Sequence, residues 1–222
     1  MAIGFIGTGA ITEAIIIGLY TRGAYTGRIL VSRRSRERST ILAERFPQVE
    51  VVDNNQSLVD RSDELFVAVL PEQVADVLGA LEFKASHRVV SLVAGLSLDE
   101  LSSLVGPAMQ CFRVIPMPPV EFGIGPTPVC PPDAKLQSLF DTIGNAIPVD
   151  DESLFTVFSS STAVMASYFE LVANIAAWMQ EEGVDAKQAT LYVTSMVNAL
   201  SKLTTRVDAE KLQRMSEACL TA

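Results

Sequence analysis

The stretch Ile3-Gly4-Phe5-Ile6-Gly7-Thr8-Gly9-Ala10-Ile11-Thr12 decides the fold of the first half of this chain. Its first four residues form a short apolar run with branched side chains, which is typical of a buried strand. Two glycines then interrupt the run, and residues 12–20 carry apolar side chains at helical spacing. The pattern therefore predicts a strand, a tight turn and a helix in direct succession.

This turn has the residues that a pyrophosphate site needs. Gly7 allows a sharp turn, and Gly9 lets the backbone approach a phosphate at the helix N-terminus, where free N–H groups and the helix dipole favour negative charge. Thr12 stands where the dinucleotide fingerprint prefers Gly or Ala. A glycine turn without a ligand is the alternative, but the strand–turn–helix context favours the fingerprint. The residues expected to bind the dinucleotide here are Gly7, Thr8, Gly9, Ala10 and Ile11.

Strands and helices continue to alternate along the first two thirds of the chain. This alternation predicts a parallel sheet covered on both faces, a Rossmann-type α/β domain over residues 1–150. Further strands are expected at residues 29–31, 49–52, 65–70, 88–93, 111–115 and 127–130, and helices at residues 36–46, 58–62 and 72–81.

The composition changes near Pro148, and no proline follows Leu154. Three helices are expected at residues 159–182, 185–206 and 208–220, which makes residues 151–222 an all-helical domain. The first of these helices is apolar almost all round, so we expect it to be buried on several sides. A helical unit of this size has a thin core, which favours a core shared in a homodimer. The most apolar run of the chain, residues 163–179, contains the polar residues Ser167, Glu170 and Asn174. These residues argue against a membrane span.

The end of the second strand indicates which dinucleotide is bound. An NAD site places Asp or Glu there to hold the ribose 2′-hydroxyl, whereas this chain has Ser32-Arg33-Arg34-Ser35-Arg36. No carboxylate is expected to repel a 2′-phosphate, and Arg33 and Arg34 can bind one through charge-assisted hydrogen bonds. A solvated basic helix face explains the nearby Arg38 and Arg45. The sequence thus predicts NADP(H), with Ser32, Arg33 and Arg34 as cofactor-binding residues.

Composition excludes several functional classes. The net charge of −9 argues against nucleic-acid binding through a basic surface. Three separated cysteines form no C-x-x-C pair, so a reduced, cytoplasmic protein without a zinc site is expected. The one histidine, His87, lies in a polar stretch, and we interpret it as an exposed surface residue. No hydrolytic triad or metal cluster can be assembled around it.

Several segments, taken in order, resemble pyrroline-5-carboxylate reductase, the enzyme family that reduces a cyclic imine to proline. Beside the glycine turn and the Val31–Ser35 segment, they are the pair Asp53-Asn54, Val69-Leu70-Pro71-Glu72-Gln73-Val74, Ser91-Leu92-Val93-Ala94-Gly95-Leu96-Ser97 and Arg113-Val114-Ile115-Pro116-Met117-Pro118-Pro119. The resemblance implies a Rossmann domain followed by a helical dimerisation domain. It also implies cofactor contacts from the pair Asp53-Asn54 and from Val69, Leu70, Pro71, Ala94 and Gly95.

The chain departs from the resembled family where substrate chemistry is expected. Leu70 replaces the lysine of V-K-P, and Met117 replaces the asparagine of P-N-T-P. The family's S-G-S-G-P-A-Y becomes Phe158-Ser159-Ser160-Ser161-Thr162-Ala163-Val164, which loses the glycines and keeps hydroxyls. The family's T-S-P-G-G-T-T loop, which supplies donors to the substrate, would begin only where residues 1–222 end. The residues expected to face the substrate are Met117, Ser160, Ser161 and Thr162.

Three functions remain open on this sequence. The ordered motifs favour an imine reductase of the pyrroline-5-carboxylate type. Leu70, Met117 and the lost glycines favour a reductase of the same architecture that acts on another imine or keto substrate. A non-catalytic NADP-binding protein is the third possibility, because a fold does not determine a function. We expect Ser160–Thr162 at a helix N-terminus to bind a substrate carboxylate, with helix capping as the alternative.

Overall fold

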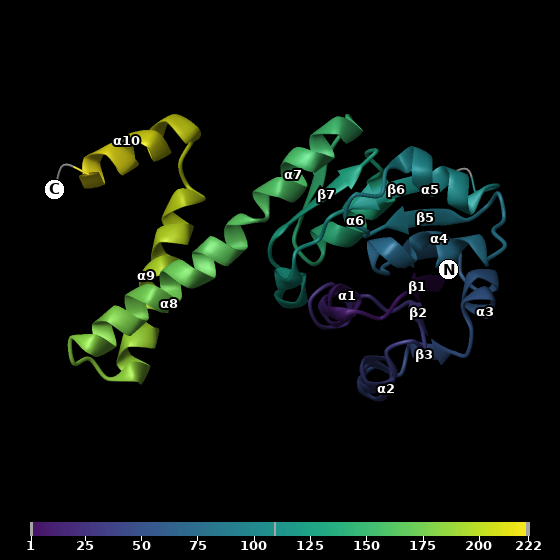
Figure 1. The fold of residues 1–222 in the computed structure, drawn as a ribbon, viewed down its shortest axis with the longest axis horizontal. Coiled ribbons are helices and arrows are strands. Elements are labelled where there is room, and N and C mark those ends of the chain that lie inside the picture. Colours follow the sequence, from purple (N-terminus) through teal and green to yellow (C-terminus); the bar gives the residue numbers. More distant parts are fainter. Residues whose placement is uncertain (1, 109, 221–222) are drawn as a thin grey trace. The chain divides into compact units, whose positions relative to one another are not determined.

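The computed structural model describes residues 2–108 and 110–220, and the chain divides into two compact units, Met1–Ser160 and Ser161–Ala222. The first unit contains an eight-stranded sheet in the order β3-β2-β1-β4-β5-β6-β7-β8 (Figure 1). Its strands are β1 (Ala2–Ile6), β2 (Arg28–Ser32), β3 (Val49–Val52), β4 (Glu64–Val67), β5 (Arg88–Ser91), β6 (Gln110–Val114), β7 (Pro126–Cys130) and β8 (Asn145–Pro148). The predicted Rossmann-type α/β architecture with a following helical unit is therefore confirmed.

Helices connect most of these strands and cover the sheet. They are α1 (Ala10–Thr21), α2 (Arg36–Arg45), α3 (Asn55–Asp60), α4 (Val74–Gly79), α5 (Leu98–Val105), α6 (Ala134–Asp141) and α7 (Phe155–Ser161), with the 3-10 turns η1 (Pro71–Gln73), η2 (Pro118–Phe122) and η3 (Glu152–Leu154). Residues 151–160, which the sequence placed with the helical domain, belong to the first compact unit. Phe155 is fully buried there against Cys130 and Val149, which attaches this segment to the sheet.

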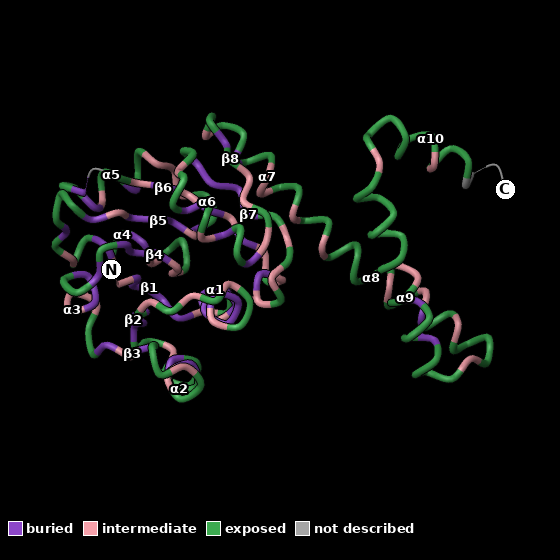
Figure 2. Tube along the Cα trace, turned by 180° about the vertical axis from the view of Figure 1, so that it is seen from behind, coloured by how far each residue is buried: buried purple, intermediate pink, exposed green. Residues whose placement is uncertain are grey.

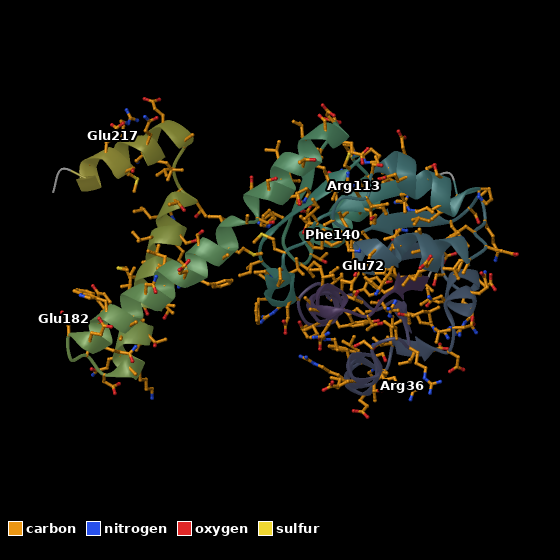
Figure 3. The ribbon with its side chains drawn as sticks, viewed as in Figure 1. Arg36, Glu72, Arg113, Phe140, Glu182 and Glu217 are labelled. Carbon is orange, nitrogen blue, oxygen red and sulfur yellow. The ribbon has the colours of Figure 1, made fainter. Side chains whose placement is uncertain are left out.

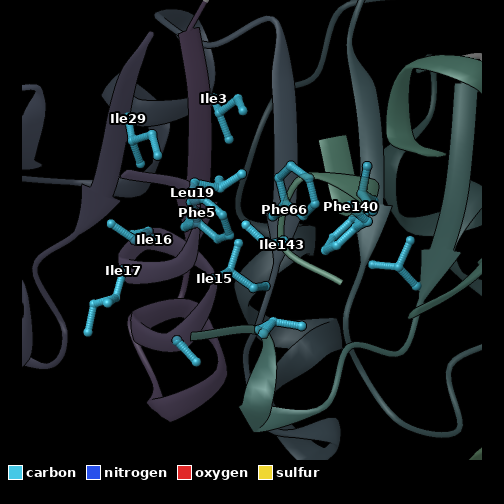
Figure 4. Close-up of a cluster of buried hydrophobic side chains, with 14 of the residues drawn as sticks. Ile3, Phe5, Ile15, Ile16, Ile17, Leu19, Ile29, Phe66, Phe140 and Ile143 are labelled. Atoms are coloured by element: carbon cyan, nitrogen blue, oxygen red, sulfur yellow. The ribbon is translucent and has the colours of Figure 1, made fainter. Parts of the chain in front are cut away.

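The main core lies between the sheet and α1 (Figure 4). Phe5 on β1 and Phe66 on β4 stack with ring centroids 4.8 Å apart, and Phe140 of α6 meets Phe66 edge-on at 6.3 Å. Ile15 and Leu19 of α1 are fully buried against them. Burying side chains of this size is worth about 1.5–3 kcal/mol each, so this contact fixes the position of α1 and of the turn before it.

The alternation of strands and helices predicted a parallel sheet, but the sheet contains an antiparallel pair. The first six strands in chain order pair in parallel, whereas β7 runs antiparallel to β6, with Arg113 opposite Cys130. A parallel pair needs a crossover connection, usually a helix of a dozen or more residues. Only the short turn η2 and its flanking loops join β6 to β7, so the chain returns in the opposite direction.

An ion cluster ties together the edge of the sheet where the parallel strands begin. The buried carboxylate of Glu64 accepts a hydrogen bond from Arg88 Nε at 2.9 Å and lies 3.2 Å from Lys135 Nζ. Arg88 also contacts Asp133 at 2.7 Å and lies over the Phe112 ring at 4.6 Å. This cluster joins β4, β5 and α6 at the edge of the sheet opposite the glycine turn.

We expect Arg88→Met to destabilise the protein, because it leaves the buried Glu64 carboxylate without its main partner. Removing one member of a buried ion pair costs about 3–5 kcal/mol. Urea unfolding should show a loss near the lower bound, since Arg88 is partly exposed, while cofactor affinity stays unchanged. Arg206→Met, at an exposed position, is the matched control. A loss below about 0.5 kcal/mol, as for a surface substitution, would contradict the assigned role.

His87 is buried, which corrects its interpretation as a surface residue. Its Nδ1 accepts a hydrogen bond from the Lys84 backbone N–H at 3.1 Å, and its ring packs edge-on against Phe83. Burial, with Lys84 nearby, lowers the pKa of the imidazole. The polar neighbours in sequence point outward while His87 itself precedes β5 and enters the core.

The second unit consists of α8 (Val164–Glu181), α9 (Ala186–Thr204) and α10 (Ala209–Leu220). Helices α8 and α9 pack against each other and bury Ala176, Ala189 and Val193. The expectation that the first long helix is buried on several sides is wrong for the single chain: α8 is exposed along most of its length (Figure 2). By length and composition alone, the helical stretch Glu152–Glu181 could cross a membrane, and 6% of its most apolar window is buried.

Candidate functional site

A cleft of about 450 Å³ opens at the carboxyl ends of β1 and β4. The chain order of the strands reverses between these two neighbours, because β2 and β3 continue on one side and β5 and β6 on the other. Ligands of open α/β sheets bind at such a switch point. The cleft is lined by Gly7, Thr8, Gly9, Ala10, Ile11, Arg34, Ser35, Ala68, Val69, Leu70, Gln73 and Leu92.

The two glycines of the turn have different roles. Gly7 has φ +101°, and a Cβ added to it would collide with the Ala68 carbonyl oxygen. Only glycine therefore fits at position 7 without a shift of the Ala68 backbone, which directly follows β4. Gly9 has ordinary extended backbone, and an added Cβ would meet no protein atom within 4 Å. The space beside Gly9 is thus open to a ligand that approaches the backbone.

The N-terminus of α1 faces this open space without a protein cap. Gly9 is the N-cap residue and provides no side-chain oxygen to the first turn. The unpaired N–H groups there and the helix dipole form a binding site for an anion. Thr12, the mild departure from the fingerprint, is fully buried and donates its hydroxyl to the Gly7 carbonyl at 2.9 Å. This hydrogen bond from the Thr12 side chain therefore stabilises the glycine turn on its buried side.

Ser32 lies behind the turn and holds it in place. Its hydroxyl accepts a hydrogen bond from the Gly7 N–H at 2.9 Å, and its carbonyl accepts one from the Thr8 hydroxyl at 2.7 Å. Both side chains are buried. The structure thus places these two predicted cofactor residues in the support of the glycine turn, with Thr8 also lining the cleft.

The two arginines after β2 point into different cavities. Arg34 lines the main cleft, whereas Arg33 lines a neighbouring cavity of about 300 Å³. Arg33 Nη1 lies 3.0 Å from Asp53 Oδ1. The expectation that no carboxylate is available near this site is therefore wrong. Asp53 follows β3, and the register of β2 with β3 pairs Ser32 with Val52, so the next residues on both strands emerge side by side.

The residues implied by the family resemblance lie at three places. Asn54 caps α3, because its Oδ1 accepts a hydrogen bond from the Ser57 N–H at 2.8 Å. Val69 and Leu70 line the main cleft, and the Leu70 side chain is 57% exposed. Pro71 begins η1 directly after Leu70. Ala94 and Gly95 line a further cavity beyond Leu92.

This further cavity, of about 150 Å³, shares Leu92 with the main cleft. It is lined by Leu92, Ala94, Gly95, Arg113, Ile115, Phe155, Thr156, Ser159 and Ser160. Arg113, labelled in Figure 3, donates to Glu152 at 2.6 Å and lies over the Phe155 ring at 4.9 Å. In the sequence Arg113 stands out only as part of the segment Arg113–Pro119, and no pattern local to β6 indicates that it lines a cavity.

The serine cluster was expected at a helix N-terminus, and this expectation is wrong. Ser159, Ser160 and Ser161 form the last residues of α7, which begins earlier, at Phe155. Thr162 lies in the turn before α8, whose N-cap residue is Ala163 and provides no side-chain cap. The last turn of a helix presents carbonyl groups, so the helix-dipole argument for a carboxylate at these serines does not hold. Ser160 nevertheless lines the Arg113 cavity.

Met117 is partly buried and begins the turn η2, where its carbonyl accepts a hydrogen bond from the Val120 N–H at 3.0 Å. It is not among the residues that line the two cavities joined at Leu92.

Cys130 lies on β7 and is buried against Phe155. Burial, together with Glu152, raises the pKa of the Cys130 thiol. This thiol is therefore kept neutral and is unsuited to act as a nucleophile.

Comparison with known proteins places this geometry in context. A family model described as NADP oxidoreductase coenzyme F420-dependent matches residues 2–95. The chain is 26% identical over 214 residues to pyrroline-5-carboxylate reductase of Haemophilus influenzae, covering 91% of this chain and 78% of that protein.

Two solved structures have the same fold. The pyrroline-5-carboxylate reductase of Streptococcus pyogenes has a TM-score of 0.82 and 25% identity, covering 98% of this chain and 84% of that chain. The pyrroline carboxylate reductase of Plasmodium falciparum, solved with NADP bound, has a TM-score of 0.82 and 16% identity over 96% and 83% of the two chains. At this low identity, the second likeness concerns the fold alone.

Proposed function

Because this chain is a divergent relative of the pyrroline-5-carboxylate reductases, we propose that it is an NADPH-dependent oxidoreductase that reduces the C=N bond of pyrroline-5-carboxylate to proline. The observation that carries the proposal is the cleft at the switch point of the sheet. It combines an uncapped helix N-terminus, an open approach to Gly9 and the guanidinium of Arg34. A pyrophosphate and a 2′-phosphate match these groups in charge and in hydrogen bonding.

The residues of the cleft would hold and orient the cofactor. The Gly7–Gly9 turn and the first N–H groups of α1 would bind the pyrophosphate, and Arg33 and Arg34 would bind the 2′-phosphate. The apolar side chains of Val69, Leu70 and Leu92 also line the cleft and would exclude water from the reacting end. The bound cofactor supplies the hydride, which is chemistry that belongs to the cofactor.

The substrate would lie where the main cleft meets the Arg113 cavity, at Leu92. Arg113, Thr156, Ser159 and Ser160 would provide the polar contacts for a carboxylate-bearing imine. A cyclic iminium already carries its proton, so this reaction does not require a side chain with a strongly shifted pKa. Such a reaction is compatible with this chain, whose single histidine is buried at the opposite edge of the sheet.

A reductase of the same architecture for a different imine or keto substrate is the second candidate. Leu70 favours it, because an exposed apolar side chain lines the cleft at the position of the family's lysine. The rates of NADPH oxidation with pyrroline-5-carboxylate and with 1-pyrroline, which lacks the carboxylate, separate the two. A clear preference for the substrate with the carboxylate supports the first candidate, and a preference for 1-pyrroline supports the second. NADPH binding without turnover of either imine supports a non-catalytic NADP-binding protein.

We also propose that the protein is a cytoplasmic homodimer, formed through the helical unit. Among the described residues of this unit, large apolar side chains remain uncovered on α8 and α9, including Phe169 at 65% and Trp178 at 59% exposure. Apolar surface of this extent marks an interaction site. Cys111 and Cys130 are free thiols, in keeping with a reducing compartment.

Light scattering should give twice the 23.9 kDa protomer mass at micromolar concentration. Phe169→Glu combined with Trp178→Glu should shift the protein towards the monomer, because each carboxylate would have to be buried in the interface. Ile41→Glu on α2, where the side chain is also about half exposed, is the matched control and should leave the mass unchanged. A wild-type protein that is monomeric under these conditions would refute the dimer.

A further inference from the structure

The cavity beside the main cleft brings cations, hydroxyl groups and one carboxylate together. Its lining consists of Arg33, Arg36, Ser39, Thr40, Val51 and Asp53. Arg33 directly follows β2 and Asp53 directly follows β3, while α2 contributes the second arginine and both hydroxyl residues. The composition suits a dianionic phosphate, with the exception of Asp53. This carboxylate is the one acidic group in the lining.

The sheet register explains why the exception lies beside Arg33. Strands β2 and β3 run in parallel with Ser32 paired to Val52, so the following residues leave the same edge of the sheet together. Arg33 Nη1 and Asp53 Oδ1 are 3.0 Å apart, with side-chain exposures of 52% and 86%. An exposed pair of this kind is weak and can be opened by a stronger anion. A phosphate that binds Arg33 must therefore replace the carboxylate.

We propose that Asp53 is a specificity-determining residue that competes with the 2′-phosphate of NADP(H) for Arg33 and so moderates the preference for NADPH over NADH. The inference rests on the proposed function. A 2′-phosphate is repelled by the nearby carboxylate and must displace it from the guanidinium. The 2′-hydroxyl of NADH is neutral and can donate a hydrogen bond to a carboxylate, as it does to the Asp or Glu at the end of the second strand in NAD sites. The same side chain thus penalises one cofactor and tolerates the other.

The test is the binding of both nucleotides to Asp53→Asn, measured by isothermal titration. NADPH should bind about two- to fivefold more tightly, the fold equivalent of an exposed ion pair. NADH should gain nothing. Asp76→Asn on α4, which removes the same charge at an exposed position, is the matched control and should change neither affinity. Equal gains for both nucleotides, an equal gain in the control, or no gain for NADPH would overturn the inference.

The double variant Arg33→Ala, Asp53→Asn tests whether the effect passes through Arg33. When Arg33 is already absent, removing the carboxylate should improve NADPH binding by less than about twofold, which is the error within which independent effects add. An undiminished gain would overturn the competition for Arg33. A wild-type protein that binds neither nucleotide overturns the proposed function itself. A wild-type protein that binds NADPH while Asp53→Asn changes nothing overturns only this inference.

Discussion

Gly9→Val is expected to abolish the binding of NADPH and NADH together, with a loss of at least about 100-fold for each, or about 2.7 kcal/mol. The branched side chain would occupy the open space beside Gly9, where a pyrophosphate must approach the first N–H groups of α1. Because no protein atom lies within 4 Å of the added Cβ and the backbone is extended, the fold should tolerate the change. Valine is a poor N-cap residue, so a decrease in melting temperature of about 3 °C is expected.

Two other glycines serve as controls for this result. Gly7→Ala should lower the melting temperature by more than about 5 °C, because a positive φ and the Ala68 carbonyl exclude a side chain there. Gly79→Val, where an added Cβ also meets open space, should leave nucleotide binding unchanged. If Gly9→Val binds NADPH with the wild-type dissociation constant, the α1 N-terminus is not the pyrophosphate site.

Arg33→Ala combined with Arg34→Ala is expected to weaken NADPH binding by at least about 100-fold and NADH binding by less than about threefold. Each hydrogen bond from a guanidinium to a phosphate contributes about 1.5–3 kcal/mol, and NADH lacks the phosphate that both would bind. Calorimetric titration with each nucleotide measures the two dissociation constants directly. NADPH binding to the wild type should also weaken with added salt more steeply than NADH binding.

A matched control for the arginine variants is Arg45→Ala at the end of α2, outside the residues that line the cavities described here. It should leave both affinities unchanged, which would show that the effect is local and not a consequence of net charge. Equal losses of NADPH and NADH in the double variant would refute the assignment of the 2′-phosphate to these arginines.

The sequence was most informative where one local pattern determines a structure. The run from Ile3 to Thr12 folds as the strand, turn and helix that it predicts, because its apolar periodicity and its glycines specify the same local structure. Helix α5 was missed although its signal is present: Ser97 and Glu100 form a capping box. Helix α6 was missed as well, although Asp133 caps it. Both helices are short, with eight residues each, so few turns are available to show a helical periodicity.

The remaining features depend on residues that are distant in the sequence. Asp53 lies beside Arg33 only because β2 and β3 pair in a particular register. Arg113 faces Glu152 and Phe155 because the segment before α7 folds back onto the sheet. The hydroxyls of Ser159–Ser161 look like a helix start in the sequence, but they end a helix that begins at Phe155. No local pattern carries these relations.

The most direct test of the proposed function is the oxidation of NADPH by the wild-type protein in the presence of pyrroline-5-carboxylate, with NADH as the control cofactor and Gly9→Val as the blank. We expect proline to form in step with NADPH consumption, NADPH to be preferred over NADH, and the blank to be inactive. NADPH bound tightly at the wild-type site, with no consumption of pyrroline-5-carboxylate, would contradict the proposed function.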